Sequence, residues 1–114
     1  MAIFTLEEAR RLLPQVRGAT QHYHDLVEGI RDSVDDPDNA QEVAQAERRM
    51  NELIQAWVDE IQRLGVDVKG LWLADFDSGD GYYYCWKLGE ADIEHFHRYE
   101  TGFAGRRPIS RLDD

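Results

Sequence analysis

Two long stretches of helical periodicity constrain this chain more than any other feature. Apolar residues recur at three- and four-residue spacing from position 6 to 34 and again from position 40 to 64, which places each set on one face of a helix. The sequence Thr5-Leu6-Glu7-Glu8 matches a capping box, so the first helix is expected to begin there. Residues 35–39 supply a turn with capping residues, and Gly65 ends the second pattern. These signals predict a long antiparallel helical hairpin.

Pro14 interrupts the first of these patterns. Proline lacks the backbone N–H and crowds the carbonyl group four residues before it, so it weakens the interior of a helix. We therefore expect a kink near Leu13, or a short first helix followed by a long one.

The composition changes at Gly65. Residues 66–76 are rich in β-branched and aromatic side chains, residues 77–81 supply turn chemistry, and Tyr82 to Trp86 resume strand character, a pattern typical of a β-hairpin. Residues 91–99 have the pattern of a short helix. The sequence therefore predicts one α+β domain over residues 1–114, made of a helical hairpin (1–64), a two-stranded β-hairpin (65–88), and a short C-terminal helix with a tail (89–114).

The charge of the chain excludes several partners. The sequence holds 23 acidic side chains against 13 Lys or Arg, a net charge of −10, which disfavours binding to nucleic acid or to an anionic membrane surface. No apolar run approaches the roughly 18 residues of a membrane span, and the N-terminus lacks the pattern of a signal peptide. The single cysteine, Cys85, fits a reducing compartment. We expect a soluble cytoplasmic protein that binds neither nucleic acid nor membrane.

The length of the helices favours a homodimer. A helix of about 25 residues is about 37 Å long, whereas the radius of gyration of a compact domain of this size is near 13 Å. Two such helices extend beyond the β-hairpin and leave part of their apolar stripes exposed. A homodimer that pairs two helical hairpins as a four-helix bundle covers these stripes. A first helix folded back at Pro14 gives a compact monomer instead.

Four histidines form two His-x-His pairs, His22 with His24 and His95 with His97. Both pairs fall in segments predicted as helices, where residues two apart point about 200° away from each other. The two rings of each pair are therefore expected to be poor joint metal ligands.

A group of polar residues in the second half of the chain is the candidate site. Asp75 is expected at the end of the first strand, Glu90 at the start of the short helix, and His97 two turns further along the same face. Together with Arg106 they can form a pocket for a small polar ligand. Cys85, Glu90 and His97 offer the sulfur, oxygen and nitrogen ligands that zinc uses. The structural alternative is that Arg106 ties the tail to a carboxylate and that Cys85 is a buried, inert thiol.

Several motifs together resemble a known family. They are Phe4-Thr5-Leu6-Glu7-Glu8-Ala9, Leu12-Leu13-Pro14, Gly70-Leu71, Asp75-Phe76, Cys85-Trp86-Lys87-Leu88-Gly89-Glu90, His97, and Gly102-Phe103 with Gly105-Arg106 and Pro108. This pattern covers nearly the whole chain and resembles the bacterial domain-of-unknown-function family 2203. The resemblance implies a bacterial origin and no transferable activity, and it adds weight to Asp75, Cys85, Glu90, His97 and Arg106 as one cluster. His95 stands where an aromatic residue is expected, which makes it the weaker histidine.

Two functions remain open at this point. The first is a non-enzymatic module that assembles as a homodimer or larger homo-oligomer, because the apolar stripes are the strongest signal in the sequence. The second is a protein, enzyme or not, that binds a divalent metal or a small polar ligand through Asp75, Cys85, Glu90, His97 and Arg106.

Overall fold

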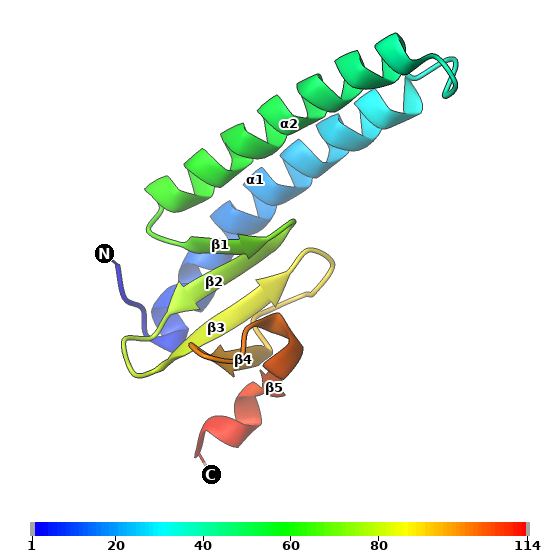
Figure 1. Cartoon of the computed structure of the whole chain (residues 1–114). Coiled ribbons are helices and arrows are strands. Elements are labelled where there is room, and N and C mark those ends of the chain that lie inside the picture. Colours follow the sequence, from blue (N-terminus) through cyan, green and yellow to red (C-terminus); the bar gives the residue numbers. More distant parts are fainter. Residues whose placement is uncertain (1, 114) are drawn as a thin grey trace.

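The computed structural model describes residues 2–113 as two long helices and a five-stranded antiparallel sheet (Figure 1). Helix α1 spans Leu6–Asp32 and helix α2 spans Ala40–Arg63. The two helices lie side by side and form the predicted antiparallel hairpin. The α+β class predicted from the sequence is therefore confirmed.

Both helices begin at the capping residues that the sequence indicates. The Thr5 hydroxyl accepts a hydrogen bond from the Glu8 amide, and the Glu8 carboxylate accepts one from the Thr5 amide, so the capping box is complete. The Asn39 side chain accepts hydrogen bonds from the amides of Gln41 and Glu42 and caps α2 in the same way.

Helix α1 runs through Pro14 without a break, so the expected division into a short and a long helix is wrong. Pro14 is exposed, whereas Leu13 and Val16 on the same helix are buried. The packing of this apolar stripe outweighs the single backbone hydrogen bond that the proline removes.

The sheet has five strands rather than the expected two. They are β1 (Asp67–Gly70), β2 (Leu73–Asp77), β3 (Tyr82–Lys87), β4 (His95–Arg98) and β5 (Arg107–Pro108), hydrogen-bonded in that order. The β2–β3 pair is the predicted hairpin. Two short 3₁₀ turns, η1 (Phe103–Gly105) and η2 (Ile109–Asp113), flank β5.

The segment expected as a C-terminal helix contains strand β4, and this expectation is wrong. In the register of the sheet, Phe96 lies opposite Tyr84 and His97 opposite Tyr83. A nine-residue helix gains little stability on its own, whereas pairing with β3 satisfies the backbone groups along an edge that would otherwise be unpaired. As a result, Glu90 lies in the loop before β4 and not in a helix.

The first expected strand is divided at Leu71 and Trp72. Trp72 has a φ of 61°, a left-handed conformation that is strained for a bulky aromatic residue. Its ring is held 4.9 Å from that of Trp57 on α2 and 5.6 Å from that of His24 on α1. The chain therefore turns here, and Asp75 comes to lie in the middle of β2 instead of at the end of a strand.

The two faces of the sheet have different neighbours. Side chains on one face, including Ala74, Phe76 and Trp86, form the hydrophobic core with Leu13 and Trp57 of the helices. Because side chains alternate along a strand, the residues between them point to the face away from the helices. Polar groups buried on that second face define the candidate site.

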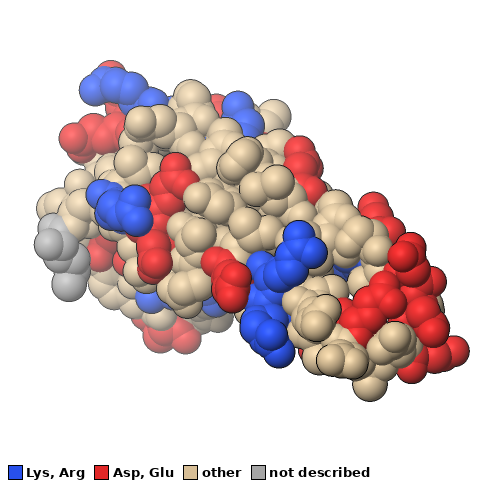
Figure 2. All heavy atoms as spheres, turned by 90° about the horizontal axis from the view of Figure 1, so that it is seen from above, with Lys and Arg blue, Asp and Glu red and all other residues tan. Residues whose placement is uncertain are grey.

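The molecule is elongated, with extents of 54 × 24 × 24 Å, because the hairpin projects beyond the sheet (Figure 1). Acidic side chains gather at its far end, over the loop that joins α1 to α2 (Figure 2). Neither helix in the described part of the chain combines the length and the apolar character that crossing a membrane requires.

Candidate metal centre

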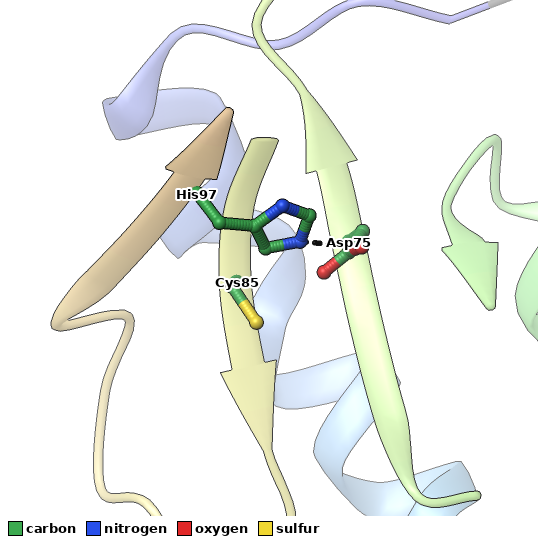
Figure 3. Close-up of side chains that lie close together, drawn as sticks. All are labelled: Asp75, Cys85 and His97. Carbon is green, nitrogen blue, oxygen red and sulfur yellow. Dashed lines mark hydrogen bonds and ion pairs between the residues drawn. The ribbon is translucent and has the colours of Figure 1, made fainter. Parts of the chain in front are cut away.

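Three neighbouring strands each contribute one buried side chain to a single polar cluster (Figure 3). These residues are Asp75 from β2, Cys85 from β3 and His97 from β4, and we call them the buried trio. Asp75 lies directly opposite Cys85 in the register, and His97 lies two residues along β4 from the partner of Cys85. All three therefore point to the face of the sheet away from the helices.

The buried trio is compact and excluded from solvent. One carboxylate oxygen, the sulfur and one ring nitrogen all lie within 4.8 Å of one another. The exposed fractions of Asp75, Cys85 and His97 are 2%, 1% and 2%. Charged groups are seldom buried in this way unless they are paired or bind a metal.

The hydrogen bonds of His97 determine where the protons are. Its Nδ1 lies 2.9 Å from the carbonyl oxygen of Arg98, which can only accept, so Nδ1 carries a proton. Its Nε2 lies 2.9 Å from Oδ2 of Asp75. An ionised carboxylate and an unprotonated Nε2 are both acceptors, so this contact requires a second proton between them. The Asp75–His97 pair therefore holds one exchangeable proton in addition to the one on Nδ1.

Burial shifts the pKa of each of the other two groups of the trio upwards. Desolvation raises the pKa of Asp75, and the charge and hydrogen bonds of His97 and the Cys85 thiol oppose that rise only in part. Desolvation and the Asp75 charge raise the pKa of Cys85 to about 12, although the nearby Arg106 acts in the opposite direction. Cys85 is therefore a thiol at neutral pH.

The arrangement does not fit a nucleophilic cysteine. Such a site needs a thiolate paired with an imidazole that a third group orients. Here Nε2 of His97 is bonded to Asp75, Nδ1 is bonded to a backbone carbonyl group, and the raised pKa keeps Cys85 protonated.

A pair of tyrosine side chains lies beside His97 of the trio. The ring of Tyr83 lies 5.4 Å from that of His97, and the ring of Tyr99 lies 4.9 Å from that of Tyr83. The ammonium group of Lys69 lies 5.1 Å from the centre of the Tyr83 ring. Tyr83 was not singled out by the sequence as a site residue, although its alternation with Cys85 along the strand places it on the same face.

Arg106 and Glu90 form a second network beside the trio. The two guanidinium NH₂ groups of Arg106 donate to the two carboxylate oxygens of Glu90 at 2.8 and 2.6 Å, and one of them also donates to the carbonyl oxygen of Cys85 at 3.2 Å. The Lys87 amide donates to Glu90 as well. Burial alone would raise the pKa of Glu90, but these hydrogen bonds outweigh it and lower the pKa. Arg106 thus fastens the C-terminal segment to the sheet.

The structure brings together the five residues that the sequence grouped, but in two connected sets. Asp75, Cys85 and His97 form the buried trio, and Arg106 links it to Glu90 through the backbone of Cys85. Glu90, expected as a metal ligand with Cys85 and His97, does not belong to the group of nearby ligand atoms, and Asp75 takes that place.

His95 and His97 share one face of β4, contrary to the expectation based on a helix. His95 lies opposite Cys85, and its Nδ1 is 3.5 Å from Glu90 Oε2 without a hydrogen bond. Residues two apart point the same way in a strand. A correct assignment of residues 95–98 as a strand would therefore have predicted that His95 and His97 share a face. His22 and His24 lie on α1, outside the cluster.

A family model agrees with the resemblance noted in the sequence. The model of DUF2203, described as an uncharacterised conserved protein, matches residues 2–109. Comparison with curated proteins and with solved structures finds no significant match.

Proposed function

Because the chain belongs to the DUF2203 family of uncharacterised conserved proteins, we propose its function from its own geometry: it binds one divalent transition-metal ion, zinc above all, through Asp75, Cys85 and His97. The observation that carries this proposal is the compact buried trio, whose oxygen, sulfur and nitrogen atoms lie within 4.8 Å of one another. Ligand atoms on one zinc ion lie roughly 3–4 Å apart, given bond lengths of about 2.0–2.3 Å. Side-chain shifts of about 1 Å suffice to close this difference.

The orientation of His97 supports a metal site. A histidine that binds a metal usually donates its other ring N–H to a carboxylate or a backbone carbonyl group, which fixes the ring and the tautomer. Nδ1 of His97 makes such a hydrogen bond to Arg98. Nε2 therefore remains as the ligand atom, and it faces Asp75.

Charge balance supports a divalent ion. Without metal, the trio holds one proton on the Asp75–His97 pair and one on the Cys85 thiol, and its net charge is zero. A divalent ion bound by a carboxylate, a thiolate and a neutral imidazole also gives a net charge of zero. Metal binding thus replaces two protons without adding charge to a buried site, where net charge is costly.

The ligand set favours zinc over magnesium or calcium. Thiolate and imidazole ligands suit zinc and neighbouring transition metals, whereas magnesium and calcium prefer oxygen ligands alone. Three protein ligands leave the fourth position of a tetrahedral zinc ion for water or another small molecule. The Glu90 carboxylate is engaged by Arg106 and serves to position the strand that carries Cys85.

Titration of the metal-free protein with Co²⁺ tests this proposal. Cobalt bound to a thiolate gives a charge-transfer absorption that is absent without sulfur ligation. We expect this band to saturate at one Co²⁺ per chain and to decrease when one equivalent of Zn²⁺ is added. Elemental analysis of the untagged protein gives an independent stoichiometry.

Matched variants separate a metal site from a purely structural network. Cys85→Ser removes the sulfur ligand and abolishes the absorption band, and His97→Ala abolishes binding. His95→Ala alters a half-buried histidine on the same strand and face and retains binding. Absence of the band in the folded wild-type protein, or equal binding by His95→Ala and His97→Ala, contradicts the proposal.

A further inference from the structure

The outer half of the helical hairpin has a groove that the sheet does not cover. Val27, Met50, Ile54, Leu71 and Trp72 line a hollow of about 300 Å³ between α1, α2 and the β1–β2 turn, with Glu28, Arg31, Glu47 and Asn51 also around it. We call this feature the hairpin groove. From it we propose that two copies of the chain form an antiparallel homodimer, a proposal independent of the metal site.

The groove is self-complementary. Leu71 stands at the β1–β2 turn with 52% of its surface exposed, directly beside the hollow that it helps to line. Leu71 is thus a projection, and the hairpin groove beside it is a hollow. If a two-fold axis passes next to them, the Leu71 side chain of each copy meets the hairpin groove of the other copy. The strained φ of 61° at Trp72 maintains the turn that projects Leu71, and strain of this kind often marks a functional segment.

The available area is sufficient for a specific interface. Residues 40–56 of α2 lie outside the main core and extend for about 25 Å at 1.5 Å per residue. Two helices side by side are about 20 Å wide, so each copy offers about 500 Å² and a dimer buries about 1,000 Å². This area meets the lower limit for a specific interface, and Leu71 with Trp72 adds to it.

Charge selects the antiparallel orientation. Residues 32–42 at the end of the hairpin include Asp32, Asp35, Asp36, Asp38 and Glu42 and no basic residue, and Figure 2 shows this acidic end. A parallel dimer would place the two acidic ends against each other. In an antiparallel dimer, each acidic end meets the part of α1 nearer the sheet.

Arg17 is the cation that this arrangement brings opposite the acidic end. Helix α1 ends about 8 Å beyond Val27, at Asp32, and Asp35 follows in the loop, whereas Arg17 lies about 15 Å before Val27 on α1, at 1.5 Å per residue. The Arg17 guanidinium donates to the carbonyl oxygen of Ala91 and forms no ion pair with a carboxylate in the described part of the chain. A two-fold axis at the level of Val27 therefore places the acidic end of each copy near Arg17 of the other copy.

Light scattering coupled to size-exclusion chromatography tests the dimer. We expect twice the chain mass of 13.2 kDa for the wild-type protein and the monomer mass for Leu71→Asp. The matched control is Ile3→Asp, which places the same charge on a residue with 63% exposure outside the groove and leaves the dimer intact. Circular dichroism confirms that both variants remain folded.

Disulfide trapping tests the orientation. Asn51→Cys, at the groove, is expected to form disulfide-linked dimers under mild oxidation, whereas Asp36→Cys, at the acidic end, is not. The wild-type chain is the blank, because its only cysteine is buried. A wild-type protein that remains monomeric at the highest soluble concentration overturns the proposal. Trapping through Asp36→Cys but not Asn51→Cys overturns the antiparallel arrangement.

Discussion

Nε2 of His97 lies 2.9 Å from Oδ2 of Asp75 in a site closed to solvent. Both atoms are acceptors in their unprotonated forms, so the pair must share a proton. The neighbouring Cys85 thiol keeps its own proton. The structure thus brings together, from three strands, one oxygen, one sulfur and one nitrogen atom of the kinds that can bind a metal ion.

Replacement of Asp75 tests the polar partner of His97. Asp75→Ala leaves the buried Nε2 without a partner, and we expect the free energy of unfolding of the metal-free protein to fall by about 1–3 kcal/mol. Asp75→Asn is nearly isosteric and can donate a hydrogen bond to Nε2, so it is expected to lose less. Urea denaturation monitored by circular dichroism measures both changes. Equal losses for the two variants would show that the hydrogen bond does not stabilise the fold.

The buried Cys85 thiol is expected to make the metal-free protein less stable as the pH rises through the alkaline range. Burial raises the pKa of its thiol from 9.0 to about 12, so between these values the folded state retains a proton that the unfolded state releases. Stability is therefore lost as the pH rises from 9 towards 12, by up to about 1.4 kcal/mol per pH unit for this one group. In Cys85→Ala, we expect a shallower decline than in the wild type. Parallel slopes in denaturation experiments over this range would refute the assignment.

The Glu90–Arg106 pair is expected to stabilise the folded state at neutral pH and to lose this effect at acidic pH. Its hydrogen bonds lower the pKa of Glu90 below the model-compound value of 4.5 despite its burial. A lowered pKa gives stability that is present above 4.5 and is lost as the pH falls through the folded-state value. Glu90→Gln should cost about 1–3 kcal/mol at neutral pH. The difference from the wild type should diminish on acidification, as measured by urea denaturation at several pH values. A constant difference would mean that the Glu90 charge contributes nothing.

A buried hydrogen-bond chain joins the two helices. The indole N–H of Trp57 donates to the Thr20 hydroxyl, which donates to the carbonyl oxygen of Val16. Thr20→Val preserves the shape but leaves the indole donor unsatisfied, at an expected cost of about 1–3 kcal/mol. Thr20→Ser retains the hydroxyl and is expected to lose less stability, as thermal or urea denaturation will show. If Thr20→Ser is the more damaging change, packing of the methyl group outweighs the hydrogen bond.

The helical hairpin was predictable because its signals are local. The capping box at Thr5 and the Asn39 cap depend on residues within four positions, and apolar periodicity identifies each helix without knowledge of the rest. Strand β4 was not predictable in this way. Residues 95–98 form a strand because the edge of β3 is available for pairing, and that contact is more distant in the sequence than a helix cap.

The grouping of the five candidate residues came from the sequence, but their geometry did not. Asp75, Cys85, Glu90, His97 and Arg106 do come together, yet the helix expected for residues 91–99 gave His97 the wrong neighbours. The division of the first strand at Trp72 moved Asp75 into the middle of β2, where it faces Cys85. The exchange of Glu90 for Asp75 among the nearby ligand atoms follows from these two long-range effects.

Calorimetric titration of the metal-free protein with Zn²⁺, in buffers of different ionisation enthalpy, tests the central claim most directly. The account predicts one zinc ion per chain and the release of two protons, one from the Asp75–His97 pair and one from Cys85. The apparent affinity should accordingly rise about 100-fold per pH unit near neutrality, because two protons are exchanged. A folded protein that binds no zinc, or that binds zinc without releasing protons, would contradict the account.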